Sequence, residues 1–255
     1  MTGHAVATID ALPSISLDDL VIQAALLDRM DRKYLVPRVQ LDDLVAAIGP
    51  GAQVLDIAGR RDFGYESVYF DTPDLLCYHL AAHRRRRRFK LRTRTYLDSA
   101  ECWFEVKTRD GRGRTVKSRR PHESAHPAVV DPETAVFAER AISTAGLDRR
   151  TGLVVAPVMT TSYRRTTLFL PASRSRVTID TDLRWAIDGH RELRLPELAI
   201  VETKTADRLS EVDHLLWRRR CRPSRVSKYG TGLAALRPEL PSTTWNRTLR
   251  RHFER

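Results

Sequence analysis

Charged or polar side chains recur two residues apart in seven short segments that have the composition of β-strands. Side chains at positions i and i+2 of a strand point to the same face, so each segment presents charge on one face of a sheet. Seven such strands indicate a closed sheet with a cationic interior that holds a few carboxylates, and such an interior suits a polyanion and a divalent cation. The segments are Asp31-Arg32-Lys33, Arg92-Thr93-Arg94, Glu105-Val106-Lys107, Lys117-Ser118-Arg119, Tyr163-Arg164-Arg165, Thr178-Ile179-Asp180 and Glu202-Thr203-Lys204.

The length and composition predict one folded domain over residues 1–255, with a core at about 26–236 and a helical tail at 237–255. A chain of 255 residues that is 42% hydrophobic can bury a real core. Lys and Arg number 44 against 32 Asp and Glu, a formal charge of +12. This excess attracts nucleic acid, anionic membrane or phosphorylated small molecules, and composition alone does not choose among them.

The three cysteines, Cys77, Cys102 and Cys221, form no C-x-x-C pair. An odd number without that spacing indicates neither a disulfide framework nor a zinc site, and it fits a reduced compartment. The first ten residues lack the features of a signal peptide, and no apolar run approaches the roughly 18 residues of a membrane span. The sequence therefore predicts a soluble, cytoplasmic protein.

Hydrophobic periodicity and turn residues divide the chain into alternating helical and extended segments. Strands are expected at 26–36, 54–58, 65–70, 89–97, 101–109, 114–119, 154–170, 176–181, 183–188 and 193–204. Helices are expected after Ser16, at 40–48, from Asp71-Thr72-Pro73 onward, at 132–145, at 210–220 and over much of the tail from Thr231.

Residues 84–88 are five consecutive arginines. Alone, they fit a solvated charge run or a nucleic-acid patch. The strand that follows changes the pattern, because Lys90, Arg92 and Arg94 share one face while apolar residues and Thr93 take the other. A guanidinium group binds phosphate oxygens in a bidentate manner and lysine adds a point charge, so this face needs an anion opposite it.

Two strands repeat one motif, a carboxylate two residues before a lysine within apolar surroundings. These are Glu105 with Lys107 and Glu202 with Lys204. Charges in such strands are costly unless they are paired or bound to a ligand. One interpretation is a cross-strand Glu–Lys pair. The other is a carboxylate for Mg²⁺ or Mn²⁺ beside a phosphate-binding lysine, with Asp180 as a further candidate ligand.

The other motifs offer little. His79 and His83 are spaced i,i+4, but no third metal ligand is evident and a solvated helix face explains them. H-E-x-x-H, G-x-S-x-G, Walker A and G-x-G-x-x-G motifs do not occur in the sequence, so the corresponding chemistries have no support.

The ordered set of segments resembles the VTC (polyphosphate polymerase) domain of the triphosphate tunnel metalloenzyme, or CYTH-like, superfamily. Each segment is weak alone, but together they span about Asp31 to Gly232. They are Asp31-Arg32-Lys33-Tyr34, Ser67-Val68-Tyr69-Phe70-Asp71-Thr72, Phe89-Lys90-Leu91-Arg92-Thr93-Arg94, Phe104-Glu105-Val106-Lys107-Thr108, Thr115-Val116-Lys117, Ser162-Tyr163-Arg164-Arg165-Thr166, Ile179-Asp180-Thr181, Val201-Glu202-Thr203-Lys204 and Val226-Ser227-Lys228-Tyr229.

The resemblance implies an α+β fold, an antiparallel eight-stranded β-barrel tunnel with helices packed outside. It also implies ATP-dependent polyphosphate synthesis with Mn²⁺ or Mg²⁺, and Glu202 as the metal ligand. By matching position, the phosphate-binding bases would be Lys33, Arg92, Arg94, Lys107, Lys117, Arg165, Lys204 and Lys228. Tyr163 and Ser227 would add hydrogen bonds. Lys90 and Arg119 are further phosphate-binding candidates, and Glu105 and Asp180 are further metal candidates, because they occupy the same charged strand faces.

One departure separates this chain from the hydrolases of that superfamily. Their first strand carries E-x-E-x-K, whereas the same frame here reads Arg29-Met30-Asp31-Arg32-Lys33, with arginine in place of one carboxylate. The change weakens metal-activated hydrolysis and favours the polymerase branch, although it leaves the role of Asp31 open.

The leading hypothesis is a phosphotransferase that moves the γ-phosphoryl of ATP onto phosphate or polyphosphate. The alternatives are a triphosphate hydrolase of the same fold and a non-catalytic polyphosphate or inositol-phosphate sensor. A nucleic-acid binder is disfavoured, because aromatic residues are not regularly interleaved with the bases. Whether a separately encoded membrane protein takes the product stays open.

Overall fold

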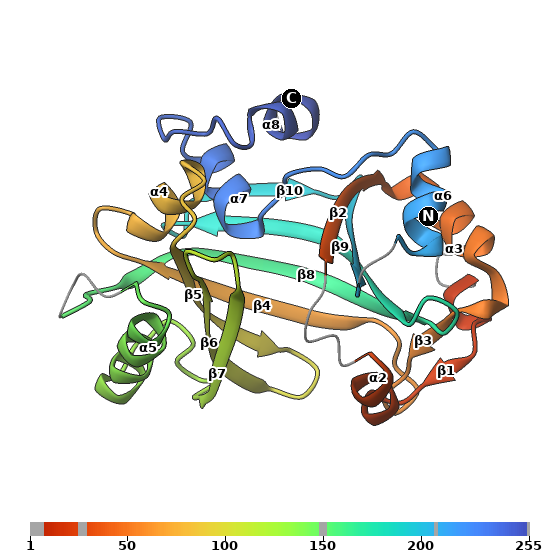
Figure 1. The fold of residues 1–255 in the computed structure, drawn as a ribbon, viewed down its shortest axis with the longest axis horizontal. Coiled ribbons are helices and arrows are strands. Elements are labelled where there is room, and N and C mark those ends of the chain that lie inside the picture. Colours follow the sequence, from red (N-terminus) through yellow and green to blue (C-terminus); the bar gives the residue numbers. More distant parts are fainter. Residues whose placement is uncertain (1–7, 25–29, 148–151, 207–208, 254–255) are drawn as a thin grey trace. The chain divides into compact units, whose positions relative to one another are not determined.

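The computed structural model describes residues 8–24, 30–147, 152–206 and 209–253, which form two compact units of α+β structure (Figure 1). Two long strands, β8 (Ala156–Leu170) and β9 (Ser175–Ile187), contribute residues to both. Unit 1 comprises Met1–Phe63, Tyr163–Leu183 and Leu195–Arg225, and unit 2 comprises Gly64–Ser162, Arg184–Arg194 and Val226–Arg255.

Unit 1 is built on an antiparallel sheet and helices. Its strand order is β2 (Met30–Pro37), β11 (Leu198–Thr205), β9 and β8, and β3 (Gln53–Leu55) pairs with β8. The short strand β1 (Ser14–Ile15) pairs with β3 in parallel. The helices are α2 (Leu17–Gln23), which Ser16 caps as predicted, α3 (Leu41–Ile48) and α6 (Glu211–Arg218).

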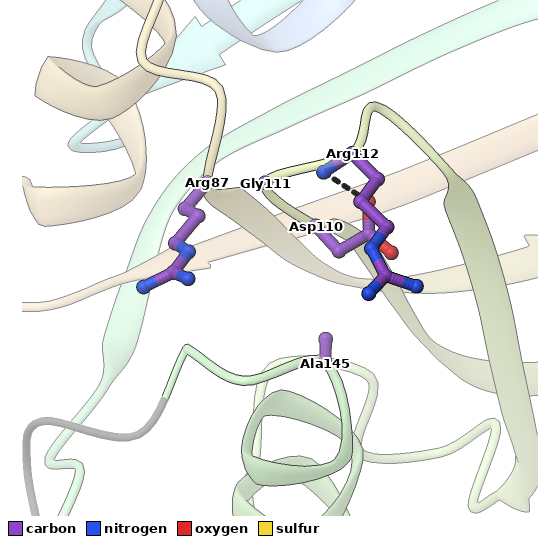
Figure 2. Close-up of a pocket in the computed structure, with 5 residues that line it drawn as sticks. All are labelled: Arg87, Asp110, Gly111, Arg112 and Ala145. Atoms are coloured by element: carbon purple, nitrogen blue, oxygen red, sulfur yellow. Dashed lines mark hydrogen bonds between the residues drawn. The ribbon is translucent and has the colours of Figure 1, made fainter.

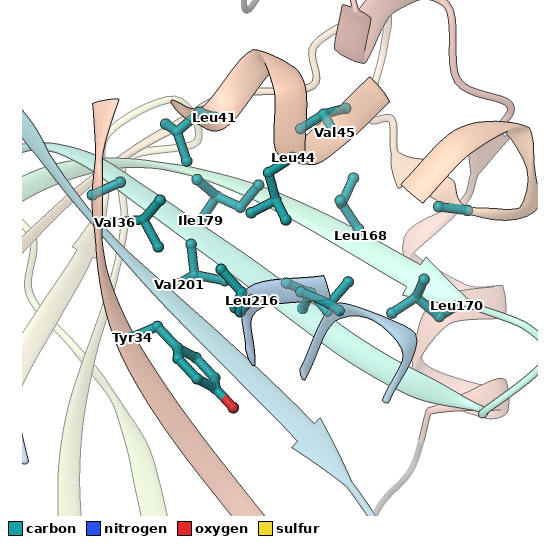
Figure 3. Packing of buried hydrophobic residues seen from close by; sticks show 14 of the residues in the cluster. Tyr34, Val36, Leu41, Leu44, Val45, Leu168, Leu170, Ile179, Val201 and Leu216 are labelled. Carbon is teal, nitrogen blue, oxygen red and sulfur yellow. The ribbon is translucent and has the colours of Figure 1, made fainter. Parts of the chain in front are cut away.

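The core of unit 1 forms where α3 and α6 cover one face of these strands (Figure 3). Period-two alternation places Tyr34 and Val36 of β2 in this core, next to Val201 of β11. The helices contribute Leu44 and Leu216, which are both fully buried. The intervening strand residues therefore project from the opposite face of the sheet.

Unit 2 is built on an antiparallel meander of β4 (Phe63–Asp71), β5 (Arg88–Tyr96), β6 (Glu101–Arg109) and β7 (Thr115–His122). A turn at Asp110 joins β6 to β7, between the strands expected at 101–109 and 114–119, and its carboxylate accepts hydrogen bonds from the backbone N–H groups of Arg112 and Arg114. The remaining elements are α4 (Leu76–Ala82), α5 (Pro132–Thr144), β10 (Arg191–Leu195), α7 (Lys228–Leu236) and α8 (Asn246–His252).

The helix expected from Asp71 begins instead at Leu76. Asp71 is fully buried, and its carboxylate accepts hydrogen bonds from the backbone N–H groups of Thr72, Cys77 and Tyr78. Asp71 thus accepts from free backbone N–H groups at the start of α4, although it precedes the helix in the chain. Pro73 lies in the turn before the helix.

Two strand boundaries also differ from the prediction. The segments expected at 176–181 and 183–188 form the single strand β9, in which Asp182 adopts a left-handed conformation with φ of 50°. The strand expected at 193–204 is divided into β10 and β11 by a turn at Pro196, which has no N–H to donate to a ladder. The first four residues expected in the strand at 26–36 lie outside the described residues.

The α+β class and the antiparallel character of the main sheet are confirmed. The structure describes eleven strands instead of eight, and their hydrogen-bonded order is open within the described residues, so the closed tunnel stays a prediction. None of the helices in the described part of the chain has the length and apolar character needed to cross a bilayer.

Candidate functional site

Six basic residues of unit 2 share one face of the β5–β6–β7 meander, which we call the basic face. In the antiparallel register, Lys90 lies opposite Lys107, which lies opposite Lys117. Directly opposed residues point to the same side of a sheet, so these lysines form a row across three strands. The neighbouring row contains Arg92, Glu105 and Arg119, and Arg94 follows on β5.

Glu105 is the carboxylate of the second row, and two bases hold it. Arg92 donates to Glu105 Oε2 from Nε at 2.7 Å and from Nη2 at 2.5 Å, and the ammonium group of Lys117 contacts Oε1. Burial tends to raise the pKa of Glu105, but the charges of Arg92, Arg94 and Lys117 outweigh it and hold the pKa below its ordinary value. Glu105 is therefore ionised at neutral pH and matches the cross-strand pairing interpretation. Its role as a metal ligand stays a prediction.

Aromatic side chains support the arginines of the basic face. The guanidinium carbon of Arg119 lies 4.6 Å from the ring centre of Trp103, and that of Arg94 lies 5.6 Å from the ring centre of Tyr65. Such stacking restricts a flexible guanidinium group and leaves its N–H donors available to an anion. Local spacing in the sequence did not reveal these contacts, because the partners come from different strands or different positions along them.

The start of α7 brings Ser227 to the basic face. Lys90 Nζ donates to Ser227 Oγ at 3.0 Å, and Ser227 caps the helix by accepting from the backbone N–H of Gly230. The carbonyl oxygen of Lys228 accepts a hydrogen bond from Trp185 Nε1 at 2.7 Å. The sequence predicted both residues as phosphate-binding, and the structure places Ser227 in contact with Lys90.

Buried Asp71 holds the first turn of α7 in place. Its carboxylate accepts a hydrogen bond from the hydroxyl of Tyr229, and the ring of Tyr229 stacks on Tyr69 with centroids 5.1 Å apart. Lys90 Nζ lies 5.8 Å from the ring centre of Tyr69 and 5.7 Å from that of Tyr229. Lys90 is thus held by Ser227 and two aromatic rings.

In unit 1, Lys33, Glu202 and Lys204 form a second cluster. Glu202 lies directly opposite Lys33 in the β2–β11 register. Its two carboxylate oxygens lie 3.8 Å from Lys33 Nζ and 3.6 Å from Lys204 Nζ. Burial lowers the pKa of Lys204 to about 7, with Glu202 opposing this shift and Arg165 adding to it. A bound anion would favour the charged form of this lysine.

Arg165 and Asp180 form a buried ion pair beside this cluster. Arg165 Nε and Nη2 donate to the two carboxylate oxygens of Asp180 at 2.6 and 2.8 Å, and Asp180 is 1% exposed. The guanidinium of Arg165 also lies 5.2 Å from the ring centre of Tyr163. Because a single arginine holds both oxygens, a metal at Asp180 would have to displace it. That role stays a prediction.

A buried carboxylate that the sequence analysis missed orients this part of unit 1. Asp213 of α6 is fully buried and accepts hydrogen bonds from the hydroxyls of Tyr34 at 2.6 Å and Thr203 at 2.7 Å. It also completes a capping box with Ser210, a signal that was readable from the Ser-x-x-Asp spacing. By fixing Tyr34 and Thr203 toward α6, it leaves their strand neighbours, including Lys33, on the opposite face.

The predicted site residues thus divide between the units. Unit 1 holds Lys33, Tyr163, Arg165, Asp180, Glu202 and Lys204. Unit 2 holds Lys90, Arg92, Arg94, Glu105, Lys107, Lys117, Arg119, Ser227 and Lys228. Among the residues that the structure describes, no three His, Cys, Asp or Glu side chains form a cluster that could bind a metal ion.

The chain also matches a protein-family model. The sequence model of the VTC domain matches residues 28–237, which include every candidate residue above. The chain therefore belongs to the VTC domain family. No curated protein matches it significantly.

Solved structures with similar architecture include the bh2851 protein of Bacillus halodurans, at 15% identity and a TM-score of 0.47 over 78% of this chain and 94% of that one. HpAC1 of Hippeastrum, described as having a dominant triphosphatase activity, has 14% identity and a TM-score of 0.43 over 84% and 98%. The PH1819 protein of Pyrococcus horikoshii has 12% identity and a TM-score of 0.42 over 80% and 98%. These low scores carry no functional conclusion.

Proposed function

We propose that this protein is an ATP-dependent polyphosphate polymerase that transfers the γ-phosphoryl group of ATP to phosphate or to a growing polyphosphate chain. The observation that carries the proposal is the basic face of unit 2. Its six basic side chains share the face with the carboxylate of Glu105, which forms ion pairs with Arg92 and Lys117. An excess of oriented cations on one face of a sheet calls for a ligand with several phosphates.

Phosphoryl transfer requires few further groups from the protein. An oxygen of the acceptor phosphate forms a bond to the γ-phosphorus while the bond from that phosphorus to the bridging oxygen breaks. ADP leaves with the electron pair, and the chain grows by one phosphate. Catalysis of such a transfer is mainly positioning and charge neutralisation, and the acceptor is already anionic, so a serine or cysteine nucleophile is not needed.

Fixed side chains make that neutralisation effective. Arg92 is held by Glu105, Lys90 by Ser227, and Arg119 by Trp103. Groups held in place before the reaction do not have to reorganise as charge develops. Arg92, Arg94 and Lys90 would bind phosphate oxygens along β5, and Lys33 and Lys204 would bind them in unit 1.

A divalent cation, Mn²⁺ or Mg²⁺, fits Glu202. Its carboxylate is a hard oxygen donor, and Mg²⁺ is usually bound by one or two carboxylates together with substrate phosphates. When bound, the ion would withdraw charge from the phosphoryl oxygens.

Polymerase activity is favoured over hydrolysis because a carboxylate of the hydrolase frame is missing. Residue 29 of this chain, which stands where the hydrolases have the first glutamate, is arginine. It lies outside the described residues. Activating a water molecule with a metal relies on paired carboxylates in that frame, and a chain-extending transfer does not require water as the nucleophile.

The test is incubation of the full chain with ATP and Mn²⁺, followed by ³¹P NMR. Signals of chain-internal phosphate together with ADP support the polymerase. Release of inorganic phosphate without chains would identify a hydrolase, and tight polyphosphate binding without ATP turnover would identify a sensor. The variant Arg92→Gln, which removes one base of the basic face, should reduce turnover, while Arg250→Gln on the exposed side of α8 should not.

A further inference from the structure

The basic face of unit 2 changes in character from one end of its strands to the other. The three lysines described above form a row across β5, β6 and β7 near one end. Near the other end, Tyr96 of β5 lies directly opposite Tyr65 of β4 and Glu101 of β6. Tyr96 lies an even number of residues after Lys90 on the same strand, so both side chains point to one face. This face therefore carries lysines at one end and aromatic rings with a carboxylate at the other.

Trp103 of β6 adds an indole to this second end, which we call the aromatic end and define by Tyr65, Tyr96 and Trp103. Trp103 follows Glu101 by two residues and so shares its face. Its Nε1 donates to Glu101 Oε2 at 3.5 Å, and the guanidinium carbon of Arg119 lies 4.6 Å from the centre of its ring. The ring centres of Tyr65 and Tyr96 are 5.1 Å apart. These contacts hold the rings in place before a ligand binds.

Two rings of the aromatic end are open to a ligand. The side chains of Tyr96 and Trp103 are half-buried, whereas the rings near the lysine row, Tyr69 and Tyr229, are 2% and 1% exposed and stack on each other. A half-buried ring presents part of its π-face, on which a nucleobase can stack. Among the described residues of this face, the aromatic end is therefore the place that offers a stacking surface.

The charges along the face match the polarity of a nucleoside triphosphate. Glu101 is exposed and would repel phosphate, but its oxygens can accept hydrogen bonds from hydroxyl or amino groups. The lysine row favours phosphate oxygens. Along β6, Trp103 and Lys107 are four residues apart, or about 14 Å. This separation is comparable with the length of an extended nucleoside triphosphate, whose base and ribose are uncharged and whose phosphates lie at the other end.

We propose that Tyr96 and Trp103 bind the nucleobase of the donor nucleotide, with the triphosphate extending along the face toward the lysine row. Arg94, whose buried Nε has no hydrogen-bond partner among the described residues, would lie beside the first phosphate. The inference rests on the proposed function for the identity of the ligand, and it adds where the nucleoside is recognised. Because stacking is tolerant of the base, the aromatic end selects nucleotides over inorganic polyphosphate and discriminates little between adenine and guanine.

The hollow of unit 2 does not provide an alternative place for the base. It has a volume of about 350 Å³ and is lined by Arg87, Asp110, Gly111, Arg112 and Ala145. Figure 2 shows the side chains of Arg87 and Arg112 extending toward the side on which Ala145 lies, at the end of α5. That helix packs on the face of β6 opposite to the basic face, where Phe137 contacts Phe104. The described lining residues include no aromatic side chain on which a base could stack.

The test measures binding of two probes to the full-length protein by calorimetry. One probe is the β,γ-imido analogue of ATP, which cannot transfer its γ-phosphoryl group, and the other is tripolyphosphate, which has no base. Trp103→Leu should bind the analogue about tenfold more weakly and tripolyphosphate almost normally. Tyr96→Leu, which leaves the contact of Arg119 with Trp103 in place, should show the same selective loss. Trp103→Phe keeps an aromatic ring and should retain most of the affinity.

Phe137→Leu is the matched control, because it removes a half-buried ring of unit 2 from the opposite face. It should bind both probes normally, and the melting temperature of each variant confirms folding. Wild-type affinity of Trp103→Leu for the analogue would overturn the inference. An equal loss for both probes would also overturn it, as would a loss in Trp103→Phe as large as that in Trp103→Leu.

The inference and the proposed function can fail separately. A selective loss of analogue binding in a protein that makes no polyphosphate would refute the polymerase and uphold the nucleobase site. Polyphosphate synthesis by a protein whose Trp103→Leu variant binds both probes normally would uphold the polymerase and overturn the nucleobase site.

Discussion

Glu202 of β11 and Lys33 of β2 are directly opposed in antiparallel register, with Glu202 Oε1 3.8 Å from Lys33 Nζ. Lys204 approaches the other carboxylate oxygen from the same strand as Glu202, at 3.6 Å. Both distances are longer than a charge-assisted hydrogen bond, unlike the contacts of Arg92 with Glu105. A substitution of Glu202 therefore distinguishes most clearly between a metal ligand and a simple ion-pair partner.

Glu202→Gln should lower metal-dependent turnover by about a hundredfold or more, since it removes the charge that a hard cation needs. Polyphosphate binding should survive or tighten, because one repulsive negative charge is gone. Turnover across a Mn²⁺ titration and polyphosphate affinity are measured on the same preparation.

Glu197→Gln is the matched control, because Glu197 is exposed in the turn before β11. It should leave turnover unchanged. A Glu202→Gln protein with wild-type rates and a lower melting temperature would show that Glu202 only pairs with the two lysines.

Glu105→Gln should destabilise unit 2 in a pH-dependent manner. The pKa of Glu105 is held below its ordinary value by Arg92, Arg94 and Lys117, so its ionised form stabilises the fold. This contribution is fully present above the unfolded pKa of about 4.3 and is lost as the pH falls below it. At pH 7 the variant should lose about 3 kcal/mol of unfolding free energy, because two bases lose a buried partner.

Denaturant unfolding at pH 7 and at successively lower pH checks this prediction. The gap between the wild type and Glu105→Gln should narrow steadily in acid. A gap that stays constant with pH would show that the substitution acts through packing and not through charge.

Gly232→Ala should destabilise helix α7, whose first residue is Lys228. A Cβ at this position would lie 2.2 Å from Trp185 Cδ1, and the indole is held by its hydrogen bond to the Lys228 carbonyl. Overpacking of this kind costs about 1–3 kcal/mol. Gly51→Ala is the control, since its Cβ would meet nothing within 4 Å.

Thermal melts of the two alanine variants give the comparison. Tripolyphosphate affinity should also fall in Gly232→Ala, because the turn bearing Ser227 and Lys228 would shift. Equal melting temperatures for the two variants would contradict the packing described for Trp185.

Asp213→Asn should cost about 2–3 kcal/mol of unfolding free energy. The amide nitrogen of asparagine cannot accept, so either the hydroxyls of Tyr34 and Thr203 or the groups of Ser210 would lose their acceptor. Asp18→Asn, on the exposed first turn of α2, should cost less than about 1 kcal/mol. Chemical denaturation of both variants measures the difference, and similar losses would remove Asp213 from its proposed structural role.

Local patterns predicted most of the strands and the residues that share their faces. The alternation along β5 was enough to place Lys90, Arg92 and Arg94 together, because side-chain direction in a strand depends only on residue parity. The turn at Asp110 and the cap at Ser16 were equally readable, since each involves residues within four positions. The start of α4 was misplaced because the acceptor for its N-terminal donors, Asp71, lies outside the helix itself.

The buried polar contacts that support the site were not predictable in this way. Asp71 contacts Tyr229 across 158 positions, and Tyr34 contacts Asp213 across 179. Neither partner carries a local signal for the other. Such pairs are defined only when the elements pack, since a buried carboxylate must find donors wherever the fold brings them.

By itself, the sequence determined that Glu105 and Glu202 each stand two residues before a lysine on a charged strand face. Only the tertiary structure distinguished them. The β5–β6–β7 register places Arg92 and Lys117 beside Glu105, and each of these bases contacts one of its two carboxylate oxygens. The β2–β11 register gives Glu202 two ammonium groups at 3.6 and 3.8 Å. Identical local spacing leads to different electrostatic surroundings, because the facing residues are chosen by strand register and not by the motif.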